Sequence, residues 1–94
     1  MTIDNLIDTS LNELLNTVFP NDKPEISEDS DLLELLDSIV LVELIMITEQ
    51  QIYDLLSVHV SLADENTFDW SSSPFRSVSL WRSHIQSLVD NLNG

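Results

Sequence analysis

Ser38 is the residue whose position in the sequence best suits covalent chemistry. It follows Asp37 and opens a stretch that is apolar from Ile39 to Ile47 except for Glu43. A serine at the start of a helix is usually an N-cap, whose hydroxyl accepts a hydrogen bond from a backbone N–H two or three residues further on. A phosphodiester on Ser38 would also be favoured there, because its charge would lie beside free N–H groups and the positive end of the helix dipole.

The segment before Ser38 consists of a helical stretch and an acidic connector. Apolar residues recur at three- and four-residue intervals between residues 3 and 18, which predicts an amphipathic helix there. Thr2 is the expected N-cap, and Pro20 is expected to end the helix. Residues 19–37 are rich in turn formers and acids, and the leucines in their second half predict that this half lies against the other helices, with room for one helical turn.

The segment from Ser38 onward is expected to be mostly helical. A helix of about four turns from Ser38 is the first interpretation, and a buried strand is the rival because of its β-branched residues. The alternating residues 58–62 predict an extended loop with its apolar side inward, and residues 63–70 are open to a short helix. A break at residues 71–74 precedes a final amphipathic helix, with Ser77 as N-cap and Asn93-Gly94 as its end.

The stretch from Asp37 to Met46 resembles the attachment motif of the acyl carrier protein family, which includes peptidyl and D-alanyl carriers. In that family an Asp-Ser pair precedes a hydrophobic residue and then a Val-Glu-Leu-hydrophobic-Met helix. Here Asp37-Ser38-Ile39 is followed in the same register by Val42-Glu43-Leu44-Ile45-Met46. The resemblance implies a single all-α domain over residues 1–94, a four-helix bundle with three main helices plus a short third helix.

The resemblance also implies a function. A phosphopantetheine transferase would move a 4'-phosphopantetheine arm from coenzyme A to Ser38, and the arm's thiol would carry acyl, polyketide or aminoacyl intermediates as thioesters. Asp37 would help to present the serine to the transferase and its metal ion. The carrier itself would supply no catalytic residue. The implied roles on the following helix are docking by Ile39, Val40, Glu43 and Met46, and inward packing by Val42, Leu44 and Ile45.

Three features depart from the family pattern. The family often has a glycine shortly before the Asp-Ser pair, where this chain has Leu35-Leu36. The positions after the serine are often polar, whereas here they are Val40 and Leu41, which predicts an unusually apolar docking face. Residues 52–76 also form a longer connection than a typical carrier has before its last helix. The pair Asp69-Trp70 is similar to a pair in D-alanyl carriers.

The composition limits the partners and the compartment. Seventeen acidic residues face three basic ones, giving a formal net charge of −14, so nucleic acid is disfavoured. The acidic surface either only aids solubility or steers the chain to partners with basic patches, and charge does not choose between the two. The resemblance implies that such partners are loading ligases, acyltransferases and ketosynthase-type or condensing enzymes. There are no cysteines, no apolar run long enough for a membrane span and no secretory pattern, so a cytoplasmic protein is expected. A monomer is expected as well, although the apolar docking face leaves a non-covalent oligomer open.

Two other function classes remain open. The runner-up is a non-modified acidic helical adaptor that binds a partner protein through Ile39, Val40, Leu41 and Met46. An independent enzyme is less favoured, because no acid, base and nucleophile occur together. His59 and His84 are expected to be surface or packing residues and not metal ligands, and no EF-hand spacing is present. The tryptophans Trp70 and Trp81 are expected to pack.

Overall fold

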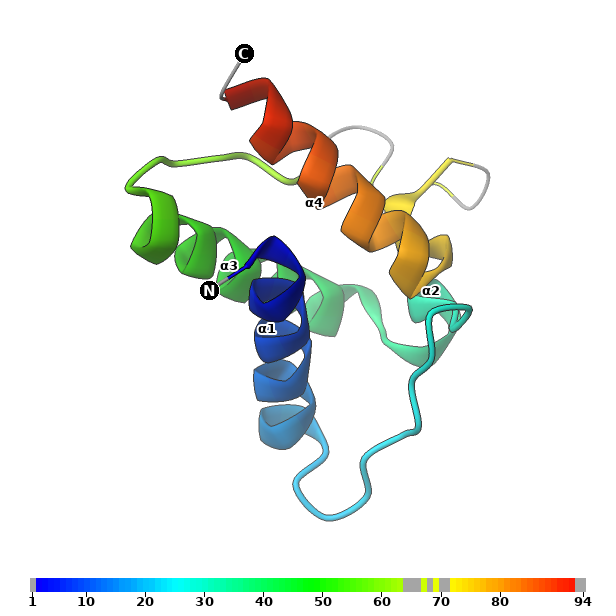
Figure 1. Cartoon of the computed structure of the whole chain (residues 1–94). Helices are drawn as coiled ribbons and strands as arrows, with labels where there is room; N and C mark the ends of the chain where they lie inside the picture. Colours follow the sequence, from blue (N-terminus) through cyan, green and yellow to red (C-terminus); the bar gives the residue numbers. More distant parts are fainter. Residues whose placement is uncertain (1, 64–66, 68, 70–71, 93–94) are drawn as a thin grey trace.

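Three long helices, one short helix and one 3₁₀ turn follow one another in the part of the chain that the structure describes. A computed structural model describes residues 2–63, 67, 69 and 72–92, and these residues contain no strand. The all-helical expectation is therefore confirmed for the described residues. The elements in chain order are α1 (Ile3–Val18), α2 (Leu32–Leu35), α3 (Ser38–Leu56), the 3₁₀ turn η1 (Pro74–Arg76) and α4 (Val78–Leu92), as Figure 1 shows.

The first and last helices begin where their N-cap residues predict. The Thr2 hydroxyl accepts a hydrogen bond of 3.1 Å from the Asn5 N–H, and the Ser77 hydroxyl accepts one of 3.0 Å from the Leu80 N–H. Each bond satisfies one of the N–H groups that the first turn of a helix leaves without an intrahelical acceptor. Both expected N-caps are confirmed, and α1 ends two residues before Pro20, as expected.

The short α-helix lies at a different place in the chain from the expected short third helix. The short α-helix is the second one, inside the acidic connector, where the Asp31 carboxylate caps it by accepting from the Leu33 N–H at 3.0 Å. Asp31 also forms an ion pair of 3.2 Å with Arg76 of η1. The expected short helix at 63–70 falls largely outside the described residues, and the described Ala63 and Asp69 are not helical.

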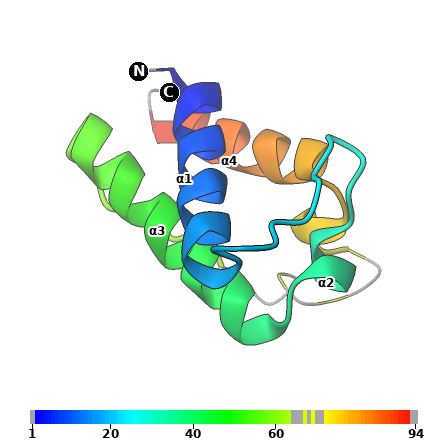
Figure 2. The same cartoon turned by 90° about the horizontal axis from the view of Figure 1, so that it is seen from below.

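The buried apolar side chains form one cluster. Helix α1 packs mainly against α3, and α4 packs against η1 and α1 (Figures 1 and 2). Trp81 of α4 is fully buried, as expected, and its ring centroid lies 4.5 Å from that of Phe75; Trp70 lies outside the described residues. The Cα radius of gyration is 12.7 Å, and a compact chain of this length has about 12 Å.

Arg82 of α4 holds the connector against α1. Its guanidinium pairs with Asp8 of α1 and, at 2.8 Å, with the Glu28 carboxylate of the connector, and Asp4 lies at 3.7 Å. The Ser79 N–H also donates to the Glu28 carbonyl at 3.0 Å. The hydrogen bond to Glu28 raises the pKa of Arg82 above its ordinary value, although burial opposes this. The Arg82 guanidinium therefore stays charged at every ordinary pH. We call its three ion pairs the Arg82 clamp, and no motif in the sequence predicts them.

A membrane-spanning helix needs about 20 mostly apolar residues. Within the part of the chain that the structure describes, no helix is long and apolar enough to cross a membrane.

Candidate functional site

The chain reaches Ser38 through two extended residues. Leu36 has φ −124° and ψ 141°, and Asp37 has φ −77° and ψ 171°. These are ordinary extended conformations that any residue adopts, so the turn between α2 and α3 requires no glycine. The Leu36 side chain is buried and anchors the turn in the core. The missing glycine before the Asp-Ser pair therefore has a simple structural account.

Asp37, and not Ser38, is the N-cap of α3. The Asp37 carboxylate accepts a hydrogen bond of 2.9 Å from the Val40 N–H, and its carbonyl accepts one of 3.0 Å from the Leu41 N–H. Ser38 is therefore the first residue inside the helix. The interpretation of Ser38 as a cap is wrong, because the neighbouring carboxylate already occupies that role.

This arrangement leaves the Ser38 hydroxyl without a structural task. Ser38 is exposed, and among the described residues its hydroxyl makes no hydrogen bond. The N–H groups of Ser38 and Ile39 likewise have no acceptor within the described chain, as is usual for the first positions of a helix. An anion attached at this point would meet free donors and the positive end of a helix of 19 residues.

One side of α3 next to Ser38 is apolar and exposed. Ile39 is 75%, Val42 44% and Met46 63% exposed, and their spacing of three and four residues places them on one side of the helix. We call these three residues the outer face of α3. The expectation that Val42 packs inward is wrong. Because α3 is apolar on both sides, apolarity alone does not distinguish its buried side from its exposed side.

The other expected positions of α3 lie as follows. Leu44 and Ile45 are buried in the core, as expected, and Glu43 is exposed. Val40 is partly buried and packs against the core cluster, and Leu41 is almost fully buried. Val40 and Leu41 thus pack mainly against the core, so Val40 contributes less to an exposed face than expected.

The C-terminal half of α3 is partly covered by the chain that follows it. Helix α3 runs to Leu56, longer than the expected four turns, and ends at Ser57, whose φ of 57° and ψ of 30° are left-handed. The chain then turns back toward α4 (Figure 1). The His59 ring stacks on Tyr53 with centroids 4.3 Å apart, and the Glu49 carboxylate accepts from the Leu62 N–H at 2.8 Å.

Residues 58–62 of the returning segment lie outside any helix, as expected of the loop, but their apolar side faces inward only in part. Leu62 is buried and Val60 partly buried, whereas Val58 is more exposed. Alternation predicted this extended piece but not its anchor to Glu49, because the pattern does not show which helix residue the loop meets. A groove of about 220 Å³ lies between the segment and the helix, with Met46 and Tyr53 among its lining residues.

The two histidines lie in different surroundings. His59 is exposed on Tyr53, and the His84 Nε2 lies 3.0 Å from the Leu62 carbonyl oxygen. Both therefore act in packing, as expected. In the described part of the chain, no three residues of the types His, Asp and Glu are grouped so that they could hold a metal ion.

Comparisons with known proteins do not place this chain in a family. No family model matches the sequence, and neither the curated proteins nor the solved structures give a significant match. The motif from Asp37 to Met46 and the geometry around Ser38 are therefore the observations that bear on function.

Proposed function

We propose that this protein is a carrier of the acyl carrier type, modified on Ser38 with 4'-phosphopantetheine. The observation that carries the proposal is the division of roles between two neighbours. Asp37 caps α3 through Val40, and this leaves the exposed Ser38 hydroxyl free at the helix start. In the motif that the chain resembles, this serine is the one that is modified.

The surroundings of Ser38 fit the arm. The Ser38 oxygen would attack the phosphorus that bears the pantetheine arm, the diphosphate bond of coenzyme A would break, and adenosine 3',5'-bisphosphate would leave. The serine proton would pass to solvent or to the transferase, and the serine oxygen would become the ester oxygen of a phosphodiester. The free N–H groups of Ser38 and Ile39 favour an anion at this end of α3. The attached group would supply a thiol that carries cargo as a thioester, and the flexible tether would raise the cargo's effective concentration at partner enzymes.

The charges near Ser38 support partners with basic surfaces. Asp37 and Glu43 form no ion pair within the described chain, whereas Arg76 and Arg82 pair with the connector and with α1. The acidic residues beside the outer face are therefore available to a basic docking patch, which would raise the association rate more than the final affinity. An enzyme that loads or extends the cargo is the expected partner class.

Intact-mass analysis tests the proposal directly. Incubation of the chain with coenzyme A and a promiscuous phosphopantetheine transferase is expected to add one phosphopantetheine, and Ser38→Ala is expected to add none. Ser79→Ala is a matched control, because Ser79 is also an exposed helix serine and should leave the modification unchanged. If the wild-type chain stays unmodified while a known carrier is fully loaded, the proposal is wrong.

The exposure of the outer face favours a second candidate, a non-modified adaptor. Ile39 and Met46 would anchor a partner protein without any use of the Ser38 hydroxyl. The two candidates differ in which substitution abolishes biological function. Under the adaptor hypothesis Ser38→Ala keeps the function and Ile39→Glu removes it, whereas a carrier loses its function with Ser38→Ala.

A further inference from the structure

Asp31 accepts hydrogen bonds from three successive backbone N–H groups of α2. Its carboxylate accepts from the Leu33 N–H at 3.0 Å, and its carbonyl oxygen accepts from the N–H groups of Glu34 and Leu35 at 3.2 Å and 3.1 Å. A helix of four residues is not stable on its own, because the cost of forming its first turn is not recovered. The position of α2 therefore depends on what holds Asp31.

Arg76 of η1 holds the other oxygen of the Asp31 carboxylate. The Arg76 Nε lies 3.2 Å from this oxygen, and the Asp31 side chain is only 18% exposed. Arg76 directly follows Phe75, which is fully buried and whose ring centroid lies 4.5 Å from that of Trp81. The guanidinium thus extends from an element that is fixed by the core, and α2 packs against this element (Figure 2).

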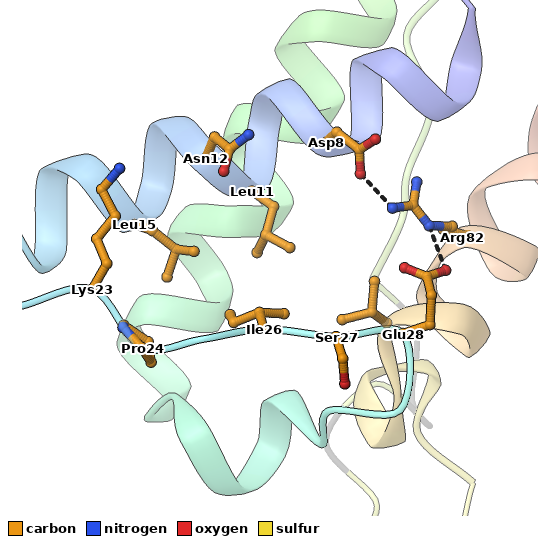
Figure 3. Close-up of a pocket in the computed structure, with 11 residues that line it drawn as sticks. Asp8, Leu11, Asn12, Leu15, Lys23, Pro24, Ile26, Ser27, Glu28 and Arg82 are labelled. Carbon is orange, nitrogen blue, oxygen red and sulfur yellow. Dashed lines mark hydrogen bonds and ion pairs between the residues drawn. The ribbon is translucent and has the colours of Figure 1, made fainter.

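The acidic connector before α2 has an anchor of its own. Arg82 pairs there with Glu28 at 2.8 Å and also with Asp8 of α1, as Figure 3 shows. Leu32 and Leu36, at the two ends of α2, are buried in the core. Loss of the ion pair of α2 should therefore loosen this helix without releasing the connector and without unfolding the chain.

Helix α2 leads directly to the candidate modification site. Only Leu36 and Asp37 separate its last residue from Ser38. The Asp37 carboxylate caps α3 through the Val40 N–H at 2.9 Å, and a cap forms only where the chain enters the helix in an extended conformation. Because helix ends fray readily, a loosened α2 lowers the fraction of molecules in which Ser38 has the position seen in the structure.

We propose that Arg76 is a positioning residue for the modification of Ser38 and that it acts through Asp31 and α2. This inference rests on the proposed function. A transferase that binds only the competent arrangement has an apparent affinity reduced by the fraction of molecules in that arrangement. Loss of the ion pair therefore raises the KM for the carrier and leaves kcat unchanged. A loss of global stability that leaves the chain folded changes neither constant.

Two substitutions that change the net charge in opposite directions test the proposal. Arg76→Gln removes a positive charge and Asp31→Asn a negative one, while asparagine keeps an acceptor for the Leu33 N–H. Initial rates of phosphopantetheine transfer, followed by intact mass over a range of carrier concentrations, should give each variant a KM about fivefold higher and a kcat within about twofold of wild type. The double variant should be no worse than either single one, because both remove the same contact.

A direct effect of charge on docking would move the two KM values in opposite directions and would overturn the proposal. Lys23→Gln is the matched control, because it removes the same charge as Arg76→Gln. Lys23 is exposed, and no ion pair joins it to another described residue, so its KM should equal that of wild type.

Hydrogen exchange on the unmodified protein provides a readout without a transferase. The amides of residues 33–36 should exchange at least about threefold faster in Arg76→Gln and Asp31→Asn, whereas those of α1 should not change. If wild type is loaded and the variants keep its KM, or if exchange at residues 33–36 is unchanged, the positioning role is wrong and the proposed function stands. If wild type is not loaded, the proposed function is wrong and the positioning role fails with it.

Discussion

The side of α3 that carries Ile39, Val42 and Met46 has different surroundings in the two halves of the helix. In the N-terminal half the outer face of Ile39, Val42 and Met46 is uncovered within the described chain. In the C-terminal half the returning segment stacks His59 on Tyr53. A helix that is apolar on both sides is usually buried on both sides. The chain covers part of the second half by itself, whereas the first half, next to Ser38, stays exposed within the described residues.

The largest expected effect is a difference in unfolding free energy between the buried and the exposed side of the N-terminal half of α3. Leu44→Ala should lower the free energy of unfolding by about 2–5 kcal/mol, because it leaves a cavity at a fully buried position. Ile39→Ala should change it by no more than about 0.5 kcal/mol, since Ile39 is 75% exposed. Urea denaturation followed by circular dichroism measures both. Equal losses would show that the outer face is covered in solution.

The sequence predicted the helices better than it predicted their faces. The bounds of α1 and the start of α4 follow from amphipathic periodicity and from the caps Thr2 and Ser77. The buried side of α3 does not follow from periodicity, because both sides of its N-terminal half are apolar, and the expectation that Val42 packs inward is wrong. Periodicity identifies a buried side only where the other side is polar.

The sequence predicted which residues form the candidate site, but it did not predict the role of each residue. Asp37 and Ser38 both follow from the motif, yet which of the two caps α3 depends on backbone geometry that a sequence pattern does not contain. The Arg82 clamp and the Glu49 anchor were missed for a similar reason. Both join residues far apart in the chain, and a single sequence does not show which acidic residue a given donor meets.

The second prediction concerns the contact that holds the returning segment against the C-terminal half of α3. Glu49→Ala takes away the acceptor of the Leu62 N–H and should cost about 1–2 kcal/mol of unfolding free energy. Glu43→Ala is the matched control on the same helix, since Glu43 is exposed and makes no hydrogen bond in the described chain, and it should be nearly neutral. Hydrogen exchange should quicken at residues 58–62 only in the first variant. Unchanged exchange there would mean that other contacts hold the segment.

A third prediction separates the two neighbours at the start of α3. Asp37→Ala removes the cap and should cost about 1 kcal/mol, whereas Ser38→Ala should cost at most a few tenths. Thermal denaturation gives both values on unmodified protein. Asp37→Asn keeps an acceptor for the Val40 N–H and should recover most of the loss. If Ser38→Ala is the more costly change, the serine hydroxyl caps the helix in solution and is less available for modification.

The smallest expected effect concerns Ser57, at which α3 ends and the chain turns back. Ser57 is the only described residue other than glycine with a positive φ, and a left-handed conformation costs an ordinary residue about 1–2 kcal/mol. Ser57→Gly removes that cost but adds freedom to the unfolded chain, so a net gain of about 0.5 kcal/mol is expected. Ser57→Ala keeps the Cβ atom and should give no gain in the same urea titration. A gain from alanine as well would show that the left-handed turn is not the source of the effect, because only glycine relieves the contact between Cβ and the backbone.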